Sequence, residues 1–493
     1  MLKLVMVGFA SFDCVFSVLL QVRIFLSPPR RDEKEVKMLE RFETLIEEKN
    51  YVALKAEIND MYPQDIALLL DEIFAEDERQ ALILFRLLTK ENAAEVFVEM
   101  SSDTQEYLIN AFSDAEIKSV FDEMFLDDTV DIIEEMPASV VSRIINQSDA
   151  ETRKLINQLL KYPEDSAGSV MTVEYVSLKK QWTVKQCFDH IRKEAVDKET
   201  IYNCYVTDET RKLIGVITVK TLLLNDYDTV IENIMETDVI SADTYADQEY
   251  VASLLSKYDL TAVPIVDQES RIVGIITVDD ALDVIEEEAT EDIAKMAAIR
   301  PSDKPYLEQS VWQIWLNRVP WLLILMVSAT FTGLIINTYE AKLAAISTVL
   351  FACVPMLMDT GGNAGSQASV TVIRSLAIGD LVPKDVFKVI WKELRVSVLL
   401  GATLAAACFA KLQLIDRLLF RFEGYDVITS AVVSLALFIT IVLAKFVGCI
   451  LPLFAKKIKL DPAVVASPFI TTIVDALSLI IYCTISIAIL TRV

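Results

Sequence analysis

The sequence predicts a multidomain chain with an all-α superhelical domain, an α/β pair of repeats, a connecting helix and an α-helical transmembrane domain of five spans. Three observations predict this fold class. Residues 31–310 contain 61 Asp and Glu against 28 Lys and Arg, whereas residues 311–493 contain 10 against 15. An internal duplication lies within residues 163–286, and the last third of the chain contains apolar segments of membrane-spanning length.

Composition excludes several functions. The acidic half repels phosphate backbones and attracts divalent cations, so we expect no nucleic-acid partner. The 7 cysteines form no CxxC pair, and the one histidine, His190, lies outside the apolar segments. Disulfides and transition-metal sites are therefore not expected.

Residues 1–33 are largely apolar, but Asp13 interrupts them and no cleavage site is clear. This segment is either a dispensable extension or an additional membrane anchor. Residues 34–162 show apolar side chains at helical spacing, as at Ile66, Leu69, Leu70 and Ile73, with Ser and Asp at the positions of helix caps. They predict an acidic solenoid of short helices, in which most carboxylates form a solvated face and a few are placed to bind a cation.

Two β-α-β-β-α units follow, at residues 163–230 and 231–286. The segment Leu213–Val219 repeats as Ile272–Val278, and Met171 at the start of one unit matches Met235 in the other. The pair resembles tandem cystathionine-β-synthase (CBS) domains, whose cleft often binds adenosine nucleotides.

The nucleotide motif is complete only in the second unit, from Gly274 to Asp280, where Thr277 and Asp280 would contact a nucleotide such as ATP. Thr221 replaces the motif Asp in the first unit. A nucleotide-binding pair and a purely structural pair both remain open.

The region that connects these repeats to the membrane segments, residues 287–316 with the helix start before it, is rich in acid. Asp280, Asp283, Glu287 and Glu291 share one helical face, where like charges repel unless a counterion is present. Bound Mg²⁺ or Ca²⁺ would neutralise the stripe, because hard cations prefer oxygen ligands. A solvated acidic linker is the alternative.

Residues 317–493 offer five candidate spans. Basic residues gather in the loops after the second and fourth spans, which places both loops and the acidic half in the cytoplasm and the C-terminus outside. The second span runs into Gly361, Gly362, Asn363 and Gly365, which predicts a backbone broken at membrane depth. The last span carries Thr471 and Asp475 on one face, and a buried acid there suggests cation handling.

This order of domains, with the sequence GGNAGSQ and the pattern DPA…P…TTxxD, resembles the MgtE family of magnesium channels over residues 38–493. The resemblance implies a homodimer with a pore between the second and fifth spans of both copies. It implies a selectivity site at Asp475, Thr471, Asn363 and Gly362. It also implies regulatory Mg²⁺ ligands, which are Glu95, Asp127, Asp131, Asp247, Glu249, Asp259, Asp280, Asp283, Glu288, Glu291 and Asp292.

The expected function is Mg²⁺-selective uptake across the cell membrane, closed by cytosolic Mg²⁺ that binds the acidic regions. Co²⁺, Ni²⁺ and Mn²⁺ are further candidate ions, and no enzymatic activity is expected. The alternative is a secondary carrier that exchanges or exports divalent cations, although Asp475 is nearly alone as an ionisable group at membrane depth.

Overall fold

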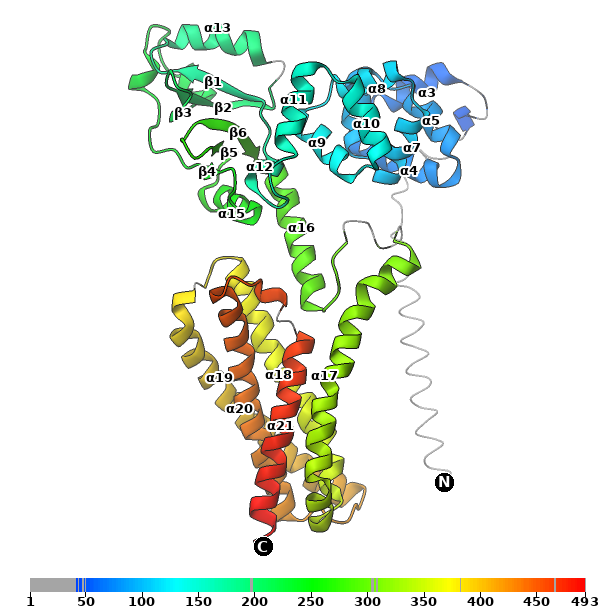
Figure 1. Cartoon of the computed structure of the whole chain (residues 1–493), viewed down its shortest axis with the longest axis vertical. Coiled ribbons are helices and arrows are strands. Elements are labelled where there is room, and N and C mark those ends of the chain that lie inside the picture. Colours follow the sequence, from blue (N-terminus) through cyan, green and yellow to red (C-terminus); the bar gives the residue numbers. More distant parts are fainter. Residues whose placement is uncertain are drawn as a thin grey trace. The chain divides into compact units, whose positions relative to one another are not determined.

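The computed structural model describes residues 41–492 except residues 43, 47, 49, 196–197, 303–305, 307–308, 382 and 465–466. The predicted extension at residues 1–33 lies outside the described residues. The chain divides into two compact units (Figure 1). The first holds short helices and two small sheets, and the second holds the connecting helix and the long apolar helices, which confirms the predicted fold class.

Short amphipathic helices form the first domain. Side chains cap some of these helices, as Asp77 accepts from the backbone N–H of Arg79 and the predicted cap Ser113 accepts from that of Glu116, whereas the predicted cap Ser101 makes no such side-chain bond. Ile66 and Leu70 are fully buried in the domain core. The helices described are α3 (Tyr51–Ile58), α4 (Pro63–Glu76), α5 (Glu78–Phe85), α6 (Lys90–Val98), α7 (Ser102–Ala111), α8 (Asp114–Phe121), α9 (Leu126–Glu135), α10 (Ala138–Gln147) and α11 (Ala150–Leu159).

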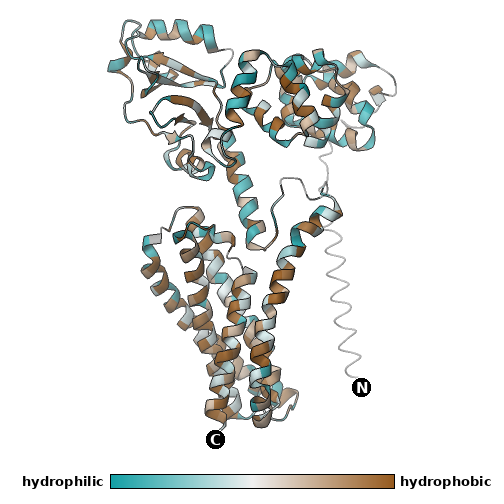
Figure 2. Cartoon of the chain, viewed as in Figure 1, coloured by the Kyte–Doolittle hydropathy of each residue, from teal (hydrophilic) through white to brown (hydrophobic). Residues whose placement is uncertain are grey.

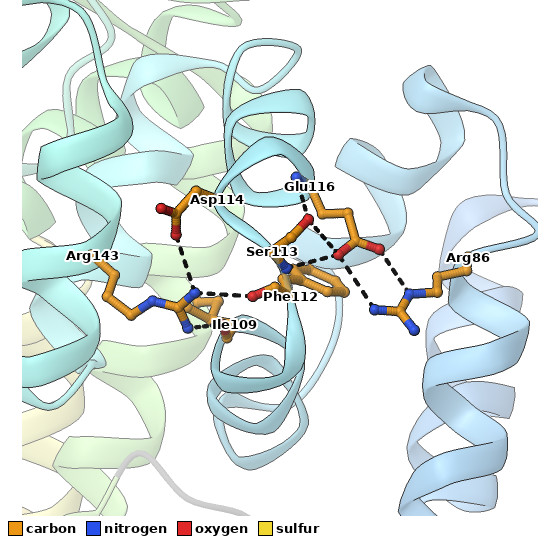
Figure 3. A network of polar contacts seen from close by, with 7 residues as sticks. All are labelled: Arg86, Ile109, Phe112, Ser113, Asp114, Glu116 and Arg143. Carbon is orange, nitrogen blue, oxygen red and sulfur yellow. Dashed lines mark hydrogen bonds and ion pairs between the residues drawn. The ribbon is translucent and has the colours of Figure 1, made fainter.

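A network of polar contacts ties α8 to the helices around it (Figure 3). Glu116 accepts a hydrogen bond from the backbone N–H of Ser113, and the Ser113 hydroxyl oxygen accepts one from the backbone N–H of Glu116, which makes a capping box. Glu116 also forms an ion pair of 2.7 Å with Arg86. Arg143 on α10 donates to the carbonyl oxygens of Ile109 and Phe112, at 2.5 and 2.9 Å. These contacts give hydrogen-bond partners to backbone groups at the end of α7 and the start of α8, and they connect these helices to the end of α5 and to α10.

Two three-stranded sheets confirm the predicted duplication. In the first, β1 (Tyr175–Lys179) pairs parallel with β2 (Thr200–Thr207), which pairs antiparallel with β3 (Leu213–Thr218). The second repeats this order with β4 (Ala242–Asp243), β5 (Ala262–Val266) and β6 (Ile272–Thr277). The helices and turns of the two units are α12 (Ala167–Val170), α13 (Val184–Glu194), α14 (Val219–Leu223), η2 (Ile231–Asn233) and α15 (Gln248–Tyr258).

Each repeat starts beside the last strand of the other repeat. The start of the first unit bonds to β6 through Thr172 and Ile275, and that of the second bonds to β3 through Glu236 and Val216. A Cβ added to Gly274 would lie 2.7 Å from the backbone carbonyl oxygen of Thr172, so glycine is favoured at this crossing. The repeated Met and Gly residues that reveal the duplication in the sequence therefore form the same contact in both repeats, Gly274 with Met171 and Gly215 with Met235.

The second unit contains the helices long enough to cross a membrane. Four of the described helices are long and apolar enough, and Figure 2 shows their hydrophobic character. The unit consists of α16 (Val278–Met296), α17 (Val311–Ile346), α18 (Val349–Ala377), η3 (Pro383–Asp385), α19 (Val386–Lys411), the π-helical turn η4 (Leu412–Leu419), α20 (Val427–Lys457), η5 (Pro462–Val464) and α21 (Ser467–Leu490). The less apolar α18 is the fifth long helix.

The predicted break in the second span is wrong, because α18 is helical from Val349 to Ala377. Its glycines serve close packing instead. A Cβ on Gly361 would lie 2.8 Å from Thr440 Cγ2 on α20, and one on Gly448 of α20 would collide with the backbone of Gly365. Small residues bring α18 and α20 together, and the helix keeps its internal hydrogen bonds.

Candidate cation pathway and regulatory sites

Three of the four predicted pore residues lie together where α18 packs against α21. The two helices run antiparallel, and the hydroxyl of Tyr482 on α21 donates to the carbonyl oxygen of Leu350 at the start of α18, at 2.7 Å. At the level of Gly362, a Cβ would lie 3.0 Å from Thr471 Cγ2 and 3.7 Å from Asp475 Oδ1. The absence of a side chain at Gly362 thus lets α18 approach closely the part of α21 that carries Thr471 and Asp475.

Asn363 follows Gly362 on the exposed side of α18. Its Nδ2 atom donates to Oδ1 of Asp359 at 3.2 Å. Since α18 continues through this position, its backbone carbonyls bond within the helix, and the side chain is the group that Asn363 offers to a pathway.

Thr471 bonds to the backbone of its own helix. The hydroxyls of Thr471 and Thr472 donate to the carbonyl oxygen of Pro468, at 2.8 and 2.9 Å. This contact fixes the first turn of α21, and Asp475 follows Thr471 by one turn on the same face. The carboxylate is therefore held on a rigid helix.

Asp127 belongs to a group of three carboxylates within the first unit. The ligand oxygens of Asp127 on α9, Glu174 before β1 and Glu199 before β2 all lie within 4.8 Å of one another. Asp127 is only 8% exposed. Such a set of oxygen donors suits a hard divalent cation, because carboxylates this close repel one another.

Sequence reasoning found Asp127 but missed Glu174 and Glu199. The duplication offered a signal, because Glu174 follows Met171 by three residues, as Asp238 follows Met235. The position of Glu199 beside them depends on the parallel pairing of β1 with β2, which the sequence does not fix.

The remaining predicted acids of the first three domains do not join a second group of three among the described residues. Glu95 and Asp131 are exposed on α6 and α9. Asp247 accepts a hydrogen bond from the backbone of Tyr250 and so caps α15, while Asp259 has a positive φ of 52° beyond the end of that helix.

The predicted acids of the connecting helix lie along α16, from Asp280 in its first turn through Asp283 and Glu288 to Glu291 and Asp292. Thr277, the other predicted nucleotide contact, is the buried last residue of β6.

The end of α16 contacts the segment that enters α21. Lys295 Nζ lies 2.7 Å from Glu291 Oε2 and 2.8 Å from Oδ2 of Asp461, which directly precedes η5. Burial alone would lower the pKa of Lys295, but its hydrogen bonds to Asp461 and Glu291 outweigh burial and raise it. Burial, and then the charge of Asp461, raise the pKa of Asp292. Sequence reasoning missed Lys295 as a counterion of the acidic stripe.

Comparison with known families defines the class of the protein. The MgtE family, described as a divalent cation transporter, matches residues 354–485, and the MgtE intracellular N domain matches residues 61–165. CBS domains match residues 167–227 and 231–287, in agreement with the predicted resemblance. With its long apolar helices, the chain is a multi-pass membrane protein of the divalent cation transporter class.

Curated relatives narrow this class to one family. The magnesium transporter MgtE of Thermus thermophilus is 36% identical over 452 residues, which cover 91% of this chain and 97% of the relative. The magnesium transporter MgtE of Bacillus subtilis is 31% identical, and the match covers 86% of this chain and 91% of that relative. A crystal structure of the cytosolic domain of the Mg²⁺ channel MgtE with ATP is 35% identical and covers 50% of this chain and 99% of that chain, with a TM-score of 0.48. The chain belongs to the MgtE family.

Proposed function

We propose that this protein carries Mg²⁺ into the cell through a pore formed by a homodimer and closes when cytosolic Mg²⁺ is plentiful. The observation that carries the pore is the carboxylate of Asp475, an ionisable group within the apolar helix α21 that lies beside Gly362 of α18. Thr471 and Asn363 complete the selectivity site. A charge at that depth is stable only where water or a cation meets it.

Such a site suits magnesium because Mg²⁺ sheds its water reluctantly. Two Asp475 carboxylates, one from each copy, attract a hydrated ion through its water shell and release it again, as conduction requires. The basic loops support a cytoplasmic position for the soluble domains and an external position for the C-terminus.

Closure follows from cation sites that exist only in the closed state. Mg²⁺ that binds Asp127, Asp131 and Glu95, the CBS acids Asp247, Glu249 and Asp259, and the acids of α16 shifts the population toward closure by mass action. The α16 acids are Asp280, Asp283, Glu288, Glu291 and Asp292. ATP at Thr277 and Asp280 is a further ligand of the CBS pair, suggested by the complete motif of its second unit.

The pore is tested by flux of Mg²⁺ into proteoliposomes. Asp475→Asn abolishes the flux if Asp475 forms the selectivity site, whereas Glu340→Gln, an exposed carboxylate of α17, leaves it unchanged. Full flux in Asp475→Asn removes the pore assignment. Flux that requires a counter-ion gradient shifts the mechanism to a secondary carrier.

A further inference from the structure

A row of polar side chains runs along the exposed side of α18. Asp359, Asn363, Gln367 and Thr371 follow one another at intervals of four residues, and all four are exposed in the single chain. Residues four apart lie on one face of a helix. The opposite side is apolar and buried, as at Leu357, Ala364 and Ala368.

This row cannot face lipid. A carboxylate and two amides in a row cost several kcal/mol in hydrocarbon, so such a face meets water or another protein surface. Two hydrogen bonds lie within the row. Asn363 donates one amide hydrogen to Asp359, and the hydroxyl of Thr371 donates to the carbonyl oxygen of Gln367 at 2.8 Å. These two bonds do not turn the row into an apolar surface.

Asp359 lies close to Asp475 but at another depth. It precedes Gly362, the neighbour of Asp475, by three residues, which is about 4.5 Å along the helix axis. Since α18 and α21 are antiparallel, this step leads toward the C-terminal end of α21.

We infer that Asp359 is a second carboxylate of the cation pathway, where a hydrated divalent cation binds on the side of Asp475 nearer the end of α21. The polar row from Asn363 to Thr371 lines the same pathway in the opposite direction, toward the start of α21. This inference rests on the proposed transport function. Two binding positions about one helical turn apart let an arriving ion repel the one at Asp475, which speeds release.

Transport kinetics test the role of Asp359. Asp359→Asn is expected to raise the half-saturating Mg²⁺ concentration of proteoliposome uptake by about 2- to 5-fold, the size of one water-exposed charge interaction. Asp475→Asn abolishes uptake, and Glu340→Gln behaves as the unchanged protein. If uptake depends on Asp475 while Asp359→Asn matches the control, this inference fails and the proposed function stands. If uptake is independent of Asp475, the proposed function itself fails.

Accessibility provides a second readout that does not depend on transport. The described cysteines, among them Cys353 and Cys408 of the membrane helices, are buried, and Cys14, outside the described residues, is replaced by serine for the experiment. In this background Asp359→Cys is expected to react with a charged, membrane-impermeant thiol reagent. Leu399→Cys, at an exposed apolar position of α19, stays unmodified in the bilayer.

Mass spectrometry of the full-length protein in vesicles measures the modification. An unreactive Asp359→Cys overturns the inference. Modification of Leu399→Cys to the same extent also contradicts it, because lipid-facing positions would then be equally accessible.

Discussion

Lys295 on α16 forms an ion pair of 2.8 Å with Asp461, the residue that precedes the turn leading into α21. The same ammonium bonds to Glu291 one turn earlier on its own helix. The ammonium group of Lys295 thus lies between two carboxylates, one on its own helix and one before η5. Through this contact the connecting helix α16 is joined to the segment that precedes α21, the helix that carries Asp475.

Lys295→Met is expected to weaken closure. The change leaves the carboxylates of Glu291 and Asp461 facing each other without their shared counterion, so the contact of α16 with η5 loses stability. The cytosolic Mg²⁺ concentration that half-inhibits the current should rise several-fold in patch recordings. Lys185→Met, at an exposed position of α13, serves as the control. Equal inhibition in both variants would mean that the ion pair has no part in gating.

Neutralising Asp283, Glu288, Glu291 and Asp292 together is expected to leave the pore open at high internal Mg²⁺. These changes remove the carboxylates of α16 that we propose as Mg²⁺ ligands. The measurement is current at millimolar internal Mg²⁺ (a range that brackets weak carboxylate sites). Unchanged inhibition would leave the acidic stripe as a solvated face.

Removal of Mg²⁺ is expected to loosen the contact of α9 with the first CBS unit. Without a cation, the carboxylates of Asp127, Glu174 and Glu199 repel at neutral pH. Hydrogen exchange of the full-length protein should therefore show faster exchange in α9 after chelation. Glu199→Gln should reduce that difference. Identical exchange with and without Mg²⁺ would contradict a cation site here.

Gly448→Ala is expected to destabilise the membrane domain by about 1–3 kcal/mol, because its methyl group would collide with the backbone of Gly365 and force α18 and α20 apart. Thermal unfolding in detergent measures the loss. Gly333→Ala on α17 is the matched control, since a Cβ there meets no atom within 4 Å. Similar unfolding temperatures for both variants would refute the close contact.

The sequence predicts the fold class well because its signals are local or repeated. Helical spacing identifies the first domain, and the duplication identifies the CBS pair through Gly215 and Gly274, whose contacts with the other repeat are equivalent. The continuity of α18 was not predicted, because glycine and proline usually weaken a helix, and packing against α20 offsets that weakness only in the folded protein.

Some residues of the candidate sites can likewise be recognised in the sequence, whereas others are brought together only by the fold. Asp475 stands out in sequence because a charge in an apolar segment is costly. Lys295 offered a signal too, four residues after Glu291, yet its second partner Asp461 is 166 positions further along the chain. Glu174 and Glu199 meet Asp127 only through tertiary structure, so no spacing rule predicts the group.

The most direct test of the account is Mg²⁺ current across excised patches that contain the purified protein, with internal Mg²⁺ stepped from near zero to several millimolar (a range that brackets weak carboxylate sites). The account predicts current at low Mg²⁺ that stops at high Mg²⁺, and no current from Asp475→Asn. Absence of current in every condition, together with slow uptake in vesicles that requires a counter-ion, would contradict it.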